Sequence, residues 1–72
     1  MTRALHLMRS LSEARKAWGL SQADLAELAG RSVSALQHSE QSEKPVMSVE
    51  AFCDFADAMG YDVVLMFRGS RR

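Results

Sequence analysis

The side chains in this sequence that suit specific recognition chemistry lie close together, between residues 33 and 38. Gln37 presents paired donor and acceptor groups of the kind that bind an adenine edge, and Ser34 can bond to several base edges. Val33 offers an apolar contact that suits a thymine methyl. His38 either donates to a base or a phosphate or is a solvated helix residue. These residue types suit the reading of duplex DNA without covalent chemistry.

Residues that could support catalysis or metal binding form no recognisable pattern. The histidines are His6 and His38, the single thiol is Cys53, and none has the spacing of a nucleophile with its base or of a metal site. A lone cysteine on an apolar helical stripe is more often core than nucleophile, and a reducing cytoplasm is the default for such a chain. We therefore predict that the protein is not an enzyme and needs no cofactor or metal.

A short helix with clear boundaries precedes these recognition residues. Ser21 and Asp24 have the spacing of a capping box, which predicts that a helix begins at Gln22. Gly30 can adopt the left-handed backbone conformation that ends a helix, so the helix should cover residues 22–29. A second helix can then begin after only a few residues.

The second helix is expected over residues 33–39, with Ser32 as its cap. If Leu36 faces the core, the helical period places Ser39 on the same side and turns the side chain of Gln37 outward with its polar neighbours. Two helices joined in this way form a helix-turn-helix, whose second helix can enter the major groove of DNA. The alternative is a pair of helices that pack together without binding DNA, because such a pair would have the same caps and the same apolar stripe.

The segment over residues 20–40 resembles a known family at a set of spaced positions. The matching residues are Leu20, Ser21, Gln22, Leu25, Ala26, Gly30, Ser32, Leu36 and Glu40. Through these residues the segment resembles the Cro/C1-type helix-turn-helix family of repressors and antitoxins. The resemblance implies that Gln22 contacts a phosphate and braces the recognition helix. Ser39 departs from the family pattern, because the family commonly has a large apolar residue there.

Further contacts to the DNA backbone are expected from residues around the second helix. Arg31 lies in the turn, where it either reaches a phosphate or buries only its stem against the first helix of the pair. Ser32 follows it at the start of the second helix, and Lys44 lies in the polar loop after that helix. We predict that these three residues and Gln22 complete the DNA-binding set.

Two further helices are expected to flank the helix-turn-helix. A helix over residues 2–17 is predicted from apolar residues at helical spacing, which are Ala4, Leu7, Met8, Leu11, Ala14 and Trp18. A helix between Ser48 and Gly60 is predicted with inward side chains, which are Val49, Phe52, Cys53, Ala56 and Met59. The predicted fold class is therefore all-α, a compact four-helix, λ-repressor-like domain over residues 1–60.

The segment over residues 61–67 differs in character, because its β-branched and aromatic residues favour a strand. Alternation would place Tyr61, Val63, Leu65 and Phe67 on one face and Asp62, Val64 and Met66 on the other. A lone strand is unstable, so pairing with the same strand of a second copy is expected. This layout resembles the HipB-type antitoxins, which dimerise through a strand from each subunit. The alternative is a fifth helix, and residues 68–72 form a basic tail in either case.

Composition limits the function classes open to the chain. Its 72 residues make one domain, 47% of them are hydrophobic, and nine basic residues offset nine acidic ones. No run of 18 apolar residues and no signal peptide is present, so we expect a cytoplasmic protein without a membrane partner. We predict a homodimeric, sequence-specific regulator of double-stranded DNA, acting as a repressor on an inverted repeat. The alternative is an interaction module whose partner is a toxin or another regulator.

Overall fold

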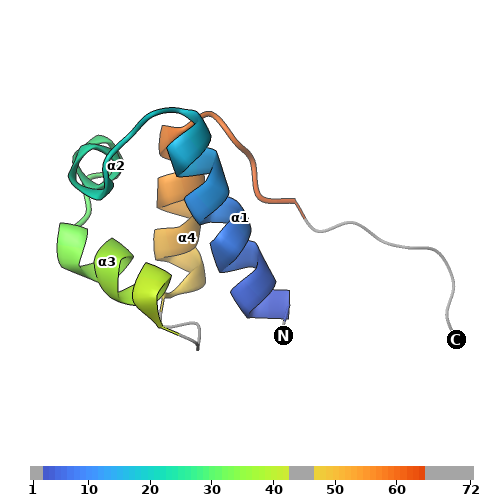
Figure 1. Cartoon of the computed structure of the whole chain (residues 1–72). Helices are drawn as coiled ribbons and strands as arrows, with labels where there is room; N and C mark the ends of the chain where they lie inside the picture. Colours follow the sequence, from blue (N-terminus) through green and yellow to red (C-terminus); the bar gives the residue numbers. More distant parts are fainter. Residues whose placement is uncertain (1–2, 43–46, 65–72) are drawn as a thin grey trace, which may run out of the picture.

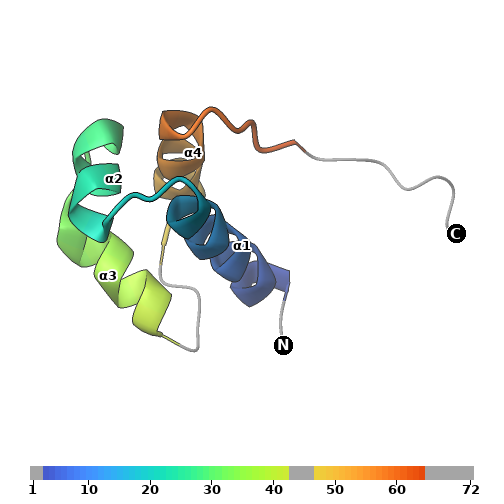
Figure 2. The same cartoon turned by 45° about the horizontal axis from the view of Figure 1, so that its top comes forward.

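The computed structural model describes residues 3–42 and 47–64, which contain four helices (Figure 1). These are α1 (Arg3–Ala17), α2 (Gln22–Ala29), α3 (Val33–Gln41) and α4 (Val49–Ala58). In Figures 1 and 2, α2 and α3 lie together on one side of the molecule, and α1 and α4 lie on the other. The fold is all-α and the α2–α3 pair is a helix-turn-helix, as the sequence predicts. Within the described ranges, no helix is long and apolar enough to cross a bilayer.

The helix boundaries follow the capping signals. Ser21 and Asp24 form the predicted capping box, in which each side chain accepts a hydrogen bond from the other residue's backbone N–H. Gly30 has a φ of 68°, a left-handed conformation that suits glycine and ends α2. Ser32 and Ser48 cap α3 and α4. The sequence predicts that α3 ends at residue 39, and this is wrong. The helix continues to residue 41, because Glu40 and Gln41 are good helix formers.

The core is centred on three fully buried side chains, those of Leu25, Leu36 and Phe55. Phe55 was not among the residues predicted to face inward, whereas Val49 was, and Val49 is 79% exposed. The buried residues of α4 are Ala51, Phe55 and Ala56, and Met59 is buried directly after the helix, so the prediction was correct for Ala56 and Met59. The error was avoidable, because Glu50, Asp54 and Asp57 lie at helical spacing on one side of α4, and the helical period then places Phe55 on the opposite side.

Three other apolar residues of the predicted stripes are exposed rather than buried. In α1, Met8 and Leu11 are buried, but Leu7 is 51% exposed. Trp18, which directly follows the last residue of α1, is 60% exposed. In α2 the sequence predicts an apolar stripe that includes Leu25 and Leu28, and of these Leu28 is 61% exposed. The apolar stripes are therefore wider than the faces that neighbouring helices cover, and α1 keeps an apolar flank.

The segment after α4 has no regular secondary structure over residues 61–64. Residues 65–67 of the predicted strand and the basic tail lie outside the described residues. A strand needs a hydrogen-bonding partner, and a single chain with no other strand in its described part supplies none. The strand and its pairing therefore stay predictions.

Candidate nucleic-acid interface

The outward face of α3 presents the residues that the sequence singled out for base recognition. Leu36 is fully buried and Ser39 is 2% exposed, so this side of α3 faces the core. The other side carries Ser34, Gln37 and His38, all of which are exposed, and Val33 lies with them at 37% exposure. The structure thus brings the four predicted side chains together on one accessible helical face.

A buried ion pair holds α3 in this orientation. Arg15 of α1 bonds to both oxygens of Glu40 of α3, with Nε–Oε2 and Nη2–Oε1 distances of 2.9 Å. The third nitrogen, Nη1, donates to the backbone carbonyl of Leu20 at 2.8 Å. The side chains of Arg15 and Glu40 are only 10% and 8% exposed. A bidentate guanidinium–carboxylate pair fixes direction as well as distance, so it sets the angle of α3 against α1.

Gln22 joins the same network from the first residue of α2. Its amide Nε2 donates to Oε1 of Glu40 at 2.7 Å. Glu40 is therefore tied to α1 through Arg15 and to α2 through Gln22, and we call these three residues the brace. The structure thus places Gln22 where it holds the recognition helix, while its contact with a phosphate stays a prediction.

The sequence analysis did not identify Arg15 as part of the site. The available signal was its position, because Met8, Leu11 and Arg15 lie at helical spacing on the buried side of α1. An arginine on an inward face needs a buried partner. The partner could have been sought in Glu40, because this carboxylate lies four residues after Leu36 on the inward edge of α3.

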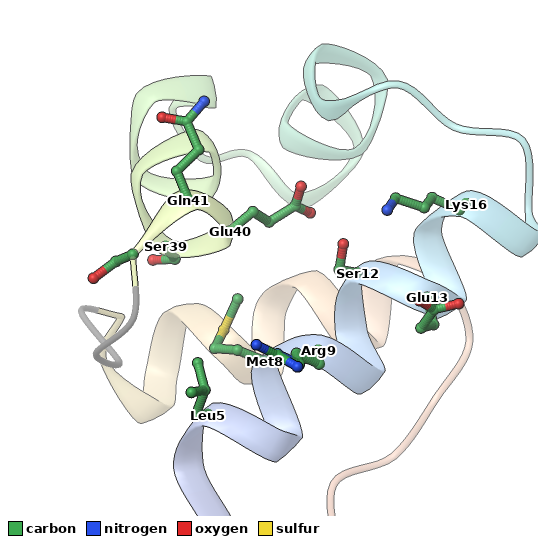
Figure 3. A pocket seen from close by; sticks show the side chains of 10 residues that line it. Leu5, Met8, Arg9, Ser12, Glu13, Lys16, Ser39, Glu40 and Gln41 are labelled. Carbon is green, nitrogen blue, oxygen red and sulfur yellow. The ribbon is translucent and has the colours of Figure 1, made fainter. Parts of the chain in front are cut away.

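The brace also shifts the acidity of its carboxyl group. Burial alone would raise the pKa of Glu40, but hydrogen bonds from Arg15 and Gln22 outweigh this effect. The charges of Arg15 and Lys16 add to the lowering, so the pKa lies below its ordinary value of 4.5. Figure 3 shows Lys16 of α1 and Glu40 of α3 pointing toward each other across a cleft of about 390 Å³. The carboxylate is therefore ionised at neutral pH.

This lowered pKa predicts a specific loss of stability in acid. The stabilisation from ionised Glu40 is complete above pH 4.5, the ordinary pKa of the unfolded state, and is lost as the pH falls through the lowered folded-state pKa. Chemical denaturation at a series of pH values should therefore show a smaller gap between wild type and Glu40→Gln below pH 4.5 than at pH 7. Equal pH slopes for the two proteins would contradict the assignment.

Arg31 and Asp54 form a second ion pair, which ties the turn to α4. The Nε and Nη2 atoms of Arg31 donate to Oδ2 of Asp54 at 2.9 and 2.7 Å. Their side chains are 31% and 45% exposed. Neither expectation for Arg31 included this partner, because Asp54 lies 23 residues further along the chain.

The other predicted backbone contacts have different surroundings. Ser32 is exposed, and its hydroxyl accepts a hydrogen bond from the backbone N–H of Ala35 at 3.3 Å, so its capping role is established. Lys44 lies outside the described residues. Arg9 and Lys16, which were not predicted to be part of the site, are exposed on the α1 side of the cleft in Figure 3.

Ser39 leaves a polar atom in the core beside this cleft. Its hydroxyl is buried and has no hydrogen-bond partner among the described residues. An unsatisfied buried hydroxyl is unfavourable, so we expect Ser39→Ala to raise the free energy of unfolding by about 1 kcal/mol. Urea denaturation checks this, with Ser34→Ala as a control for the higher helix propensity of alanine at an exposed position of α3. If Ser39→Ala stabilises no more than the control, the hydroxyl has no such cost.

Comparison with known proteins is consistent with this architecture. Searches of curated proteins and of solved structures found no significant match. A family model described as a helix-turn-helix domain matches residues 3–66, which is most of the chain and includes all four helices. The match agrees with the Cro/C1-type resemblance of residues 20–40 and indicates a DNA-binding regulator. The chain belongs to the helix-turn-helix domain family.

Proposed function

We infer that this protein is a cytoplasmic, sequence-specific regulator of double-stranded DNA that acts as a repressor. The observation that carries this proposal is the combination of an exposed polar face on α3 with the brace that fixes it. The face presents Gln37 and Ser34 to solvent, while Arg15 and Gln22 both bind Glu40 behind it. Direct readout needs side chains held at a defined angle to the groove, and a rigid support provides that angle.

Each residue of the proposed interface has a role that follows from its chemistry. Gln37 is proposed to bind adenine through its amide, and Val33 to contact a thymine methyl. Ser34 and His38 are proposed to add hydrogen bonds to base edges or phosphates. The proposed phosphate contacts come from Gln22, Arg31, Ser32 and Lys44.

The active form is proposed to be a homodimer that binds an inverted repeat. The chain has no net charge, so a monomer with one short recognition helix has few means of holding DNA tightly. Two copies would present two recognition helices, which could occupy successive major grooves about 34 Å apart. The proposed connection is an antiparallel ribbon formed by residues 61–67 of each copy, in which Tyr61, Val63, Val64, Leu65, Met66 and Phe67 make the contacts.

Selection from random duplex DNA tests the proposal directly. We expect enrichment of an inverted-repeat motif, with native mass spectrometry showing two protein chains per duplex. If no motif is enriched, the specific-repressor proposal is wrong. A protein-interaction role, with a toxin or another regulator as partner, would then be the better account, since the exposed Leu7 and Trp18 are available to such a partner.

Gln37→Ala tests the proposed base contact. We expect the variant to lose about 1–3 kcal/mol of binding free energy at one base position and to lose discrimination there, because a bidentate contact distinguishes adenine from other bases. Quantitative binding to operators varied at each position measures this loss. Gln41→Ala is the control, because Gln41 is also exposed on α3 but lies in its last turn. A uniform loss over all operator variants would contradict a base-reading role for Gln37.

A further inference from the structure

The cleft between α1 and the end of α3 is large enough to hold a small molecule. Its volume of about 390 Å³ is within the range of small-molecule sites. Residues 39–42 line it from α3, and residues between Leu5 and Lys16 line it from α1 (Figure 3). At Ser39 the cleft borders the buried side of α3, not the outward side that carries Gln37.

Three donor groups lie on one stripe of α1 along this cleft. Arg9, Ser12 and Lys16 follow one another at intervals of three and four residues, which places them on the same side of a helix. All three line the cleft. Within residues 3–42 and 47–64, none of their side chains forms a hydrogen bond or an ion pair. The stripe therefore presents a guanidinium, a hydroxyl and an ammonium group without an acceptor in this part of the chain.

The opposite wall of the cleft contains another polar group without a partner. Ser39 lines the cleft from α3 and is 2% exposed, and its Oγ has no hydrogen-bond partner among the described residues. A buried polar group is normally satisfied, and leaving it unsatisfied is unfavourable. A ligand oxygen on this side of the cleft would accept the missing hydrogen bond.

The charges around the cleft favour an anionic ligand. Two carboxylates line it, those of Glu13 and Glu40. The charge of Glu40 is already matched by Arg15, which binds both of its oxygens. Arg9 and Lys16 then face the single charge of Glu13, so the positive charge is in excess. In Figure 3, the side chains of Ser12 and Lys16 point into the space in front of Glu40.

The donor set suits a phosphate group better than a carboxylate. A phosphate monoester has three strong acceptor oxygens and a carboxylate has two, so only the phosphate offers a separate oxygen to each of three donors. The other end of the cleft is apolar, because Leu5 and Met8 line it (Figure 3). A ligand that matches the whole cleft therefore combines a phosphate with a small apolar group.

We propose that this cleft is a binding site for a small organic phosphate. Arg9, Ser12 and Lys16 of α1 hold the phosphate, and the hydroxyl of Ser39 of α3 donates a further hydrogen bond. The ligand contacts both helices that the Arg15–Glu40 pair joins, so its binding stabilises the folded domain. The site needs no DNA, and it stands or falls separately from the proposed function.

Isothermal titration calorimetry of the full chain tests the site with three probes, in a phosphate-free buffer without DNA. Phenyl phosphate should bind about tenfold more tightly than inorganic phosphate, because its ring covers the apolar end of the cleft. It should also bind about tenfold more tightly than benzoate, which has the same ring and fewer acceptor oxygens. Equal binding of benzoate would overturn the preference for phosphate. If phenyl phosphate does not bind at millimolar concentration, there is no such site.

Variants of the lining residues should change the affinity for phenyl phosphate in opposite directions. Arg9→Met and Lys16→Met should each weaken binding about tenfold, because each removes a charge-assisted hydrogen bond. Glu13→Gln should strengthen binding about threefold, because it removes a repulsive charge. Arg3→Met is the matched control, because Arg3 is exposed on α1 and does not line the cleft. If Arg3→Met weakens binding as much as Lys16→Met, the probe is attracted to surface cations in general, and the site is wrong.

Ser39→Ala separates a role in binding from a role in packing. We expect this variant to bind phenyl phosphate about fivefold more weakly, although it should raise the free energy of unfolding of the unliganded protein. A more stable protein with lower ligand affinity is not the result of damage to the fold. Unchanged affinity would remove Ser39 from the site.

The backbone of duplex DNA is the other possible source of a phosphate group. Affinity of the wild type and of Arg9→Met/Lys16→Met for duplex DNA, measured in phosphate-free buffer, distinguishes the two sources. A change of less than about twofold supports a small-molecule site. A loss of about tenfold on every duplex would show that these two cations bind the DNA backbone, which overturns the proposal. Because the calorimetry contains no DNA, its result is valid even if the proposed repressor function is wrong.

Discussion

Replacing Arg15 with methionine is expected to lower the free energy of unfolding by about 3–5 kcal/mol. The substitution leaves the Glu40 carboxylate buried with only the amide of Gln22 as a partner. An uncompensated buried charge costs far more than an exposed one. A domain of 72 residues has limited stability, so this loss should leave a large part of the protein unfolded at 25 °C.

Removing both charges should restore most of this stability. In Arg15→Met/Glu40→Leu no charge is left buried, and apolar replacements of similar size are often neutral or stabilising. Urea denaturation of the single and double variants measures both effects. Arg9→Met is the matched control, because Arg9 is exposed on the same helix and its loss should change stability by less than about 0.5 kcal/mol. If the double variant is as unstable as Arg15→Met, the loss comes from packing and not from the stranded carboxylate.

Val64→Pro is expected to have the largest effect on DNA binding, a loss of about 10²–10⁴-fold in affinity for an inverted repeat. Proline removes a backbone donor from the middle of the proposed ribbon, so the two copies would separate. Each half-site would then be bound without the gain in effective concentration that a linked pair provides. Val64 is 70% exposed in the single chain, so the helical domain itself should be unaffected.

Three measurements check this prediction together. Circular dichroism should show unchanged helix content, and sedimentation should show a shift from dimer to monomer. Affinity for an isolated half-site should match that of the wild type, because α3 is unaltered. If Val64→Pro remains a dimer with full operator affinity, the ribbon is not the dimer contact.

The features that could be predicted from the sequence are those set by local physics. The capping box of Ser21 and Asp24 involves residues three apart, and the left-handed turn at Gly30 depends on one residue. The outward face of α3 follows from the position of Leu36 and the helical period. These signals were sufficient to predict the helix-turn-helix and the side of α3 that is exposed.

The features that were missed depend on contacts between distant parts of the chain. Arg15 and Glu40 are 25 residues apart, and sequence alone counts their charges without showing that they meet. Phe55 is a different case, because Glu50, Asp54 and Asp57 mark the outer face of α4 and the helical period then places Phe55 inward without any knowledge of tertiary contacts. The brace is therefore a property of the tertiary structure, whereas the centre of the core was not.

The pairing of Arg31 with Asp54 has a consequence for how this protein would search DNA. A cation already neutralised by a carboxylate displaces fewer condensed counterions when it approaches a phosphate. Arg15 is likewise occupied by Glu40, so two of the arginines nearest the recognition helix contribute little to sequence-independent attraction. Binding should then depend less on ionic strength than the number of basic residues suggests, and random DNA should retain the protein more briefly than it would if both arginines were unpaired. The ratio of specific to random affinity rises because the affinity for random DNA is lowered.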